Sequence, residues 1–246
     1  MGLVLIHLPI PKGDRLLVLG TREHPDIGYN ILARTKLSGD VILGRHIRSG
    51  FTDRCLAKHA PIALIHGEPR ENHPVPFFGA YSTSAPYSGL PTRFPLQRPG
   101  PSPIGDDSFF SWAPLGSVSS ARTFYDESTG FCRGIMLQYE NGGCCTLGQC
   151  RIHVDVTKTV VRPVQVCFRV ESYENDRGHL FYRVDAEFEH SLRHEQSDQG
   201  WKCQPLRGVV KFCLHAIHHS WLLKTKRRKH MTSNSPPSPV MGLRTI

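Results

Sequence analysis

Strict alternation of apolar and polar residues is the feature of this sequence that most limits how it can fold. In residues 180–189, LFYRVDAEFE, every second position is apolar, and the positions between them are charged from Arg183 onward. A period of two fits a β-strand with one buried face, because successive side chains of a strand point to opposite faces. Residues 133–139, 164–170 and 210–216 alternate in the same way. The pattern predicts a β-sheet protein.

A turn signal follows one of these segments. Residues 140–143 read Glu-Asn-Gly-Gly, and an Asn-Gly pair tolerates the positive φ angles of a tight hairpin turn. Residues 144–154 then resume an extended pattern, and residues 117–125 are a weaker strand candidate. About six short strands without a convincing helical segment are typical of antiparallel β folds. We therefore expect an all-β, or mainly β, antiparallel sandwich or prism.

Proline divides the chain into regions. Of its 19 prolines, 13 precede residue 108 and only three lie in residues 108–221. Each proline removes a backbone donor and fixes φ, so the proline-rich front of the chain is expected to be poorly structured. We expect residues 1–84 to be weakly structured, residues 85–107 to be a Pro/Gly-rich linker, residues 108–221 to form the antiparallel β domain, and residues 222–246 to be a basic disordered tail.

Three apolar runs in the N-terminal region carry a weak strand signal. They occupy residues 16–19, 41–43 and 61–65, with glycine or proline close by. Apolar runs this short are compatible with an edge strand or with no regular structure, and the sequence leaves both interpretations open.

Charge is distributed unevenly over these regions. The chain carries a formal net charge of +9, yet residues 108–221 hold 12 basic and 12 acidic residues. Residues 222–246 hold six basic residues and no acidic one, five of them in the run Lys224–His230. Nucleic-acid-binding domains usually carry their basic surface on the fold itself. We expect nucleic-acid binding to be nonspecific and limited to the tail, whose basic run is also a candidate nuclear import signal.

The eight cysteines of the chain raise the question of disulfides, which need an oxidising compartment. The N-terminus has neither the basic start nor the long apolar run of a signal peptide. Nowhere does an apolar window approach the roughly 18 residues that span a bilayer. We therefore expect an intracellular protein, cytoplasmic or nuclear, without a membrane partner and with its thiols reduced.

Cysteines cluster near the predicted hairpin, where Cys132, Cys144, Cys145 and Cys150 precede His153. A structural zinc site needs paired ligands in a knuckle and a second pair at a distance. Here two of the cysteines are adjacent, and adjacent residues of a strand point to opposite faces. The arrangement favours buried thiols that act as small apolar side chains over a metal site.

Histidines form a second candidate cluster, with His215, His218 and His219 after the last alternating segment. Zinc proteases place His-Glu-x-x-His on a helix, with the glutamate as general base. In this chain Ala216 stands where that glutamate would be, so the pattern favours histidines at a strand end or in a loop.

Carboxylates for acid–base chemistry are available at Asp185, Glu187, Glu189 and Glu195. The first three occupy the polar positions of an alternating segment, which indicates a solvated strand face. The glycine-rich nucleotide motifs and the Gly-x-Ser-x-Gly nucleophile motif are absent from the sequence. The sequence therefore supports no assignment of a catalytic, cofactor-binding or metal residue.

Several short motifs carry a family resemblance over about 110 residues of the chain. They occupy residues 110–115, 124–125, 132–135, 139–142, 147–151, 200–203 and 206–208. With these segments the sequence resembles a family of predicted filamentous-fungal proteins with a β-rich domain, in which a Gly-Ile/Met-Leu-x-Tyr-x-Asp/Asn-Gly segment precedes Gly-Gln-x-Arg. That resemblance implies no activity.

Residues 117–139 are also similar to one Greek-key unit of jacalin-like β-prism lectins, in which a strand, a short turn and a Gly-Ile-x-Val-x-Tyr strand follow one another. This second resemblance implies a carbohydrate ligand.

These observations favour a non-catalytic β-rich binding module whose partner is a carbohydrate or a protein. Two alternatives stay open at this point. One is a hydrolase-type enzyme whose site residues are scattered along the sequence and form no recognisable motif. The other is an intracellular regulatory or structural protein that acts through its basic tail.

Deletion of Lys224–Ile246 is expected to abolish any nucleic-acid affinity and any nuclear accumulation, and to leave the melting temperature of the remaining domain unchanged. Binding through at most the six tail cations should weaken steeply as salt rises, because it depends on counterion release. Fluorescence anisotropy with DNA at several salt concentrations measures this. If a chain ending at Trp221 bound DNA or RNA with sequence preference, the neutral domain itself would carry a surface that recognises base sequence.

Overall fold

The computed structural model contains only β-strands as regular structure in the part of the chain that it describes. The described residues are 6–26, 28–45, 47, 49–58, 62–68, 78–82, 108–174, 180–192, 200–215 and 221–226. The predicted all-β fold is therefore confirmed. The strands are β1 (Leu16–His24), β2 (Gly28–Thr35), β3 (Gly39–Leu43), β4 (Thr52–Lys58), β5 (Ile62–His66), β6 (Phe78–Ser82), β7 (Ser108–Pro114), β8 (Val118–Tyr125), β9 (Cys132–Tyr139), β10 (Cys144–Gly148), β11 (Val156–Val161), β12 (Gln165–Glu174), β13 (Leu180–Glu189), β14 (Lys202–Pro205), β15 (Val209–His215) and β16 (Trp221–Lys226).

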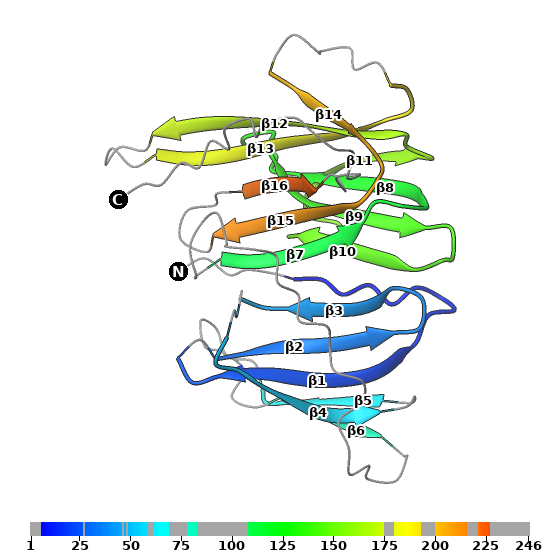
Figure 1. Ribbon diagram of the computed structural model, residues 1–246, viewed down its shortest axis with the longest axis vertical. Coiled ribbons are helices and arrows are strands. Elements are labelled where there is room, and N and C mark those ends of the chain that lie inside the picture. Colours follow the sequence, from blue (N-terminus) through cyan, green and yellow to red (C-terminus); the bar gives the residue numbers. More distant parts are fainter. Residues whose placement is uncertain are drawn as a thin grey trace, which may run out of the picture.

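Three antiparallel sheets form the main body of the protein, the upper part of Figure 1. Their strand orders are β10-β9-β8-β11, β13-β12-β14 and β16-β15-β7. β10 lies beside β7, and β13 lies beside β16. Contacts of this kind join the sheets around a single core, as in a sandwich.

The core of the main body is built on the predicted hairpin. Ile135 and Leu137 of β9 and Leu147 of β10 are fully buried, which confirms the prediction from alternation. Ile135 pairs with Leu147 across the hairpin. The same apolar cluster includes Ala113 of β7 and Phe212 of β15. Strands of all three sheets therefore contribute side chains to one core.

A close backbone crossing ends β10 earlier than the sequence predicted. The chain was expected to stay extended to Val154, but the strand stops at Gly148, which has φ of +66°. A Cβ atom at Gly134 would lie only 2.4 Å from the carbonyl oxygen of Gln149. Only glycine leaves room for this approach. The chain then passes through a turn to reach β11 at the opposite edge of the same sheet.

Ion pairs stabilise the turn between β10 and β11. Asp155, whose side chain is 1% exposed, accepts a hydrogen bond of 3.0 Å from the Nε of Arg151 and lies 3.9 Å from the Nε of Arg133. Arg133 also pairs with Asp126 in the loop between β8 and β9. Burial and the neighbouring Arg151 both lower the pKa of Arg133, while Asp155 raises it. The carboxylates of Asp126 and Asp155 offset the repulsion between the guanidinium groups of Arg133 and Arg151, which lie close together.

The N-terminal region is more regular than the sequence predicted. Residues 16–58 include a four-stranded antiparallel sheet of order β3-β2-β1-β4, and β5 pairs with β6. The sequence of strand β1 shows no alternation of apolar and polar residues, because residues 18–22 are all buried. A strand covered on both faces shows no alternation, so the apolar run 16–19 gave only a weak signal. The predicted linker, residues 85–107, lies outside the described residues.

Buried polar groups hold this N-terminal sheet together. The guanidinium of Arg22, 4% exposed, donates hydrogen bonds of 2.7 and 2.8 Å to both carboxylate oxygens of Asp53 in the neighbouring strand. The ring of Phe51 lies 4.1 Å from the same guanidinium. A bidentate pair supported by an aromatic ring satisfies a charge that would otherwise be costly to bury. Arg22 therefore occupies a position where a sequence pattern leads one to expect an apolar residue.

The C-terminal end of the β domain lies further along the chain than the sequence predicted. Residues 221–226 form β16, which pairs with β15 from Val209–Lys226 to Leu214–Trp221. The tail was expected to begin at residue 222, but Leu222 and Leu223 continue the strand pattern before the basic run. Residues 227–246 lie outside the described part. A tail deletion that spares the fold therefore begins at Arg227 rather than Lys224.

Membrane-spanning helices are absent from the described residues.

Replacement of Leu137 by alanine should lower the free energy of unfolding by roughly 2–5 kcal/mol, because it leaves a cavity in a fully buried site. Gln138, which follows Leu137 on the exposed face of β9, provides the matched control. Its replacement by alanine should change stability by less than about 0.5 kcal/mol. Urea unfolding of both variants measures the difference, and similar small effects at the two positions would contradict the core assignment.

Candidate functional site

Two of the three carboxylates predicted on β13, Asp185 and Glu187, form ion pairs. Asp185 stands opposite Arg169 of β12 in the strand register, with 3.4 Å between the carboxylate and the guanidinium. Arg169 also pairs with Glu171 at 3.1 Å. Glu187 accepts a hydrogen bond of 3.3 Å from the ammonium of Lys158 on β11. These carboxylates serve as partners of cations from neighbouring strands.

Asp185 departs from the solvated face that the sequence predicted. Its side chain is 18% exposed. Burial raises the pKa of Asp185, and the Arg169 guanidinium acts in the opposite direction. The ring of Trp201 lies 5.2 Å from the same guanidinium. Glu189 ends β13, and Glu195 lies outside the described residues. Asp185 and Glu187 are half-buried, and each faces a cation: Arg169 in the same sheet and Lys158 of β11 in another sheet.

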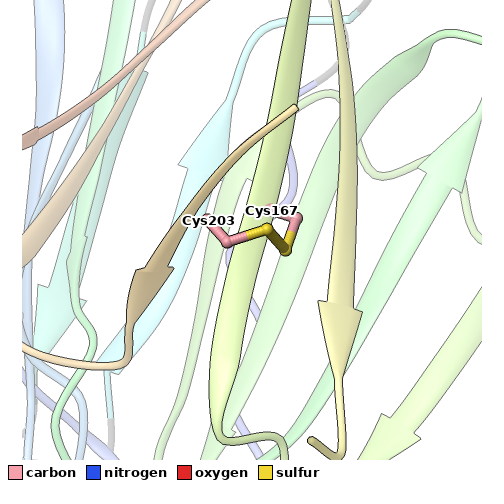
Figure 2. The surroundings of a disulfide bond; sticks show 2 residues. All are labelled: Cys167 and Cys203. Atoms are coloured by element: carbon pink, nitrogen blue, oxygen red, sulfur yellow. A yellow bond between two sulfur atoms is a disulfide. The ribbon is translucent and has the colours of Figure 1, made fainter. Parts of the chain in front are cut away.

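A disulfide joins the two cysteines at the centre of this sheet (Figure 2). Cys167 of β12 and Cys203 of β14 face each other in the strand register, with their Cα atoms 4.0 Å apart. The expectation that all eight thiols are reduced is therefore wrong for this pair. The two cysteines are 36 residues apart in the sequence, so their proximity depends on strand pairing that no local pattern reveals.

The cysteines near the hairpin are free and buried. Burial raises the pKa of each of the four thiols, in the case of Cys144 to about 11. A thiol with a raised pKa is a poor nucleophile near neutral pH, because the thiolate is the reactive form. These four cysteines therefore pack as small apolar side chains; they are Cys132, Cys144, Cys145 and Cys150.

The histidine candidates do not come together with other metal-binding groups in the described part. His153 lies in the turn after β10 with φ of +64°, and His215 is the last residue of β15. His218 and His219 lie outside the described residues. Among the residues that the structure describes, no group of three or more histidines, cysteines or carboxylates could hold a metal ion.

Hollows in the described part are small. One, of about 30 Å³, lies between the N-terminal sheet and β7, where Ile42, Phe109, Trp112 and Phe212 are among its lining residues. Two others measure about 20 Å³ each. Pockets that hold drug-sized ligands measure about 300–1,000 Å³. None of these three cavities is large enough to enclose such a ligand.

The free edge of β11 is an open feature on the main body. The amide of Arg162 donates to the carbonyl of Ser119 at 2.7 Å. In an antiparallel pair the residues alternate between bonding to the partner strand and pointing away from it. Arg162 therefore belongs to the set of residues that bonds to β8. By this alternation and the register with β8, the backbone amides and carbonyls of Thr157, Thr159 and Val161 point away from β8, toward the free edge. Among the described residues, none of these backbone groups has a hydrogen-bond partner.

Side chains around this edge are exposed and largely apolar. Val156 is 53% exposed and Val161 is 59% exposed, and Val154 and Val164 beside the strand are also exposed. Of the six residues of β11, only Val160 is buried. Edge strands are commonly guarded by a charged side chain. The single charge in this strand, Lys158, is directed to Glu187 of β13.

The opposite edge of the same sheet, strand β10, is covered by other segments of the chain. On β10 the outward amide of Cys144 donates to the hydroxyl of Ser38 at 2.9 Å. The amide of Gly148 donates to the hydroxyl of Ser111, also at 2.9 Å. Thr146 between them donates its hydroxyl proton to the carbonyl of His7. The edge of β10 is thus covered by neighbouring segments, whereas no described segment pairs with the edge of β11.

Comparison of the chain with protein-family models, curated proteins and solved structures found no match in any of the three. The resemblances to fungal β-rich proteins and to jacalin-like lectins stay predictions. By its geometry, the free edge of β11 is the strongest candidate for a binding site in the described part of the chain. Sequence reasoning missed it because an edge is defined by the order of strands in a sheet.

Denatured, unreduced protein should show six free thiols rather than eight, because Cys167 and Cys203 form a disulfide. Replacing both by serine should lower the free energy of unfolding by about 3–4 kcal/mol, the entropic effect of closing a loop of this length. Thiol titration in denaturant and urea unfolding measure the two effects. A count of eight thiols would show that the pair is reduced.

Proposed function

We propose that this protein is a non-catalytic β-rich binding module that takes up an extended polypeptide strand along β11. The observation that carries the proposal is the row of outward backbone groups at Thr157, Thr159 and Val161, which have no partner among the described residues. An added strand would hydrogen-bond to these groups and extend the sheet from four strands to five. Peptide recognition by strand addition takes its affinity from such main-chain hydrogen bonds.

The chemistry around the edge favours a polypeptide over a carbohydrate. Val156 and Val161 in the strand and Val154 and Val164 beside it are exposed, and an added strand would cover apolar side chains of this kind. Sugars are usually held by stacking on aromatic faces, and β11 contains no aromatic residue. The small hollows of the described part give no support to a small-molecule ligand.

The arrangement of carboxylates supports a non-catalytic role. A general acid and a general base need environments that drive their pKa values apart, together with room for a substrate between them. Asp185 and Glu187 each face a cation, Arg169 and Lys158, at 3.4 and 3.3 Å. The hydrolase alternative therefore draws no support from the residues that the sequence singled out.

Selection of a random-peptide display library on the immobilised protein tests the proposal. We expect enrichment of extended peptides with apolar residues at alternate positions. Thr159→Pro should abolish their binding, because it removes an outward amide while leaving the hydrogen bonds to β8 in place. Thr159→Ala keeps that amide and is the matched control. It should retain binding within a few-fold.

Two results would contradict the proposal. One is a library without enriched peptides. The other is a set of peptides that bind the proline variant as well as they bind the alanine variant. A glycan array run in parallel addresses the carbohydrate alternative, and a specific glycan that still binds Thr159→Pro would move the binding site away from β11.

A further inference from the structure

The register of β11 allows the partner strand to be named. Resting on the proposed function, we infer that a second copy of this chain binds at β11, with the two strands antiparallel about a two-fold axis at Thr159. The interface is isologous, since the same strand serves on both sides. It joins two four-stranded sheets into one continuous sheet of eight strands.

Hydrogen-bond geometry limits how two copies of β11 can meet. Only residues whose backbone groups point outward can bond to a partner, and these are Thr157, Thr159 and Val161. A two-fold axis at Thr159 pairs Thr159 with itself and Thr157 with Val161 of the other copy. All three outward residues of each strand are then used, which gives the longest ladder that β11 can form with itself.

Charge and ladder length disfavour the two neighbouring registers. An axis at Lys158 would place the two lysines directly opposite each other in a close, non-hydrogen-bonded pair, and like charges in opposed positions destabilise a sheet. An axis at Val160 would place Thr157 opposite Pro163 of the other copy, which has no amide to donate, so the ladder would be shorter. With the axis at Thr159, Lys158 faces Val160, and the two lysines do not meet.

Side-chain chemistry fits the same register. Thr159 opposes Thr159, a cross-strand pair that is favourable in antiparallel sheets. The exposed methyl groups of Val161 face the threonine at position 157 of the other copy. Lys158 stays available for Glu187 of its own chain at 3.3 Å, because it lies on the same face of β11 as the buried Val160.

Single-cysteine variants test this register directly. Under mild oxidation Thr159→Cys should form a covalent dimer, because the two positions meet at the axis, with Cα atoms about 5.5 Å apart as in a hydrogen-bonded pair. Thr157→Cys alone and Val161→Cys alone should not cross-link, since neither position meets itself. An equimolar mixture of these two variants should cross-link, because residue 157 of one copy faces residue 161 of the other.

Light scattering gives a second measurement that needs no cysteine. At roughly 100 µM, where an association of micromolar Kd is nearly complete, the wild-type chain should show twice the mass of one chain. Thr159→Pro should show the mass of a single chain, and Thr159→Ala should remain dimeric. Non-reducing gels of the wild-type protein, whose described free cysteines are mostly buried, give the background for the cross-linking.

Three results would overturn the inference: a wild-type monomer at that concentration, a Thr159→Cys variant that cross-links no more than wild type, or strong cross-linking of Thr157→Cys alone. The peptide selection separates this inference from the proposed function. If the chain is monomeric but selected peptides still depend on the amide of Thr159, the edge is a binding site for other chains and only the self-pairing is wrong. If peptides and self-pairing both fail, the proposed function fails too.

Discussion

Burial of β9 in a core shared by three sheets is the constraint on which the main body depends. Ile135 and Leu137 are fully buried, and their neighbours in the core come from β7, β10, β12, β13 and β15 as well as from β8. A sheet of three or four strands needs another layer to cover its apolar face. Each sheet here covers the others, so a slip of one residue in β9 would turn its apolar set away from all of them.

The crossing of the backbone at Gly134 decides which edges the largest sheet of the main body exposes. Because the chain passes over β9 after Gly148, it can return to the sheet at β11, on the far side from β10. Asp155, paired with Arg151 and Arg133, fixes the end of this passage. The glycines and the ion pairs place β11 at the edge of the sheet, where its outward backbone groups have no partner among the described residues.

The sequence predicted those strands that have one buried and one exposed face. Residues 133–139 and 180–189 alternate because each packs one face against the core, and both were placed correctly. Strand β1 lost its alternation because both faces are covered, and β11 because nearly every side chain is exposed. The disulfide between Cys167 and Cys203 and the free edge of β11 depend on which strands are neighbours. That order is set by packing over the whole chain, so local patterns did not reveal it.

The contrast between the two edges of one sheet explains why the N-terminal region, which the sequence predicted to be weakly structured, matters to the proposed binding site. Ser38, which follows β2, and the carbonyl of His7 meet outward groups of β10, and Ser111 of β7 meets another. The N-terminal segments therefore remove one of the two edges at which a strand could be added. An open-ended sheet with two free edges can grow into a fibre, whereas one with a single free edge closes after one addition. Among the described residues, covering β10 leaves β11 as the edge of this sheet whose outward backbone groups have no partner, and the proposed pairing there about a two-fold axis would end in a dimer.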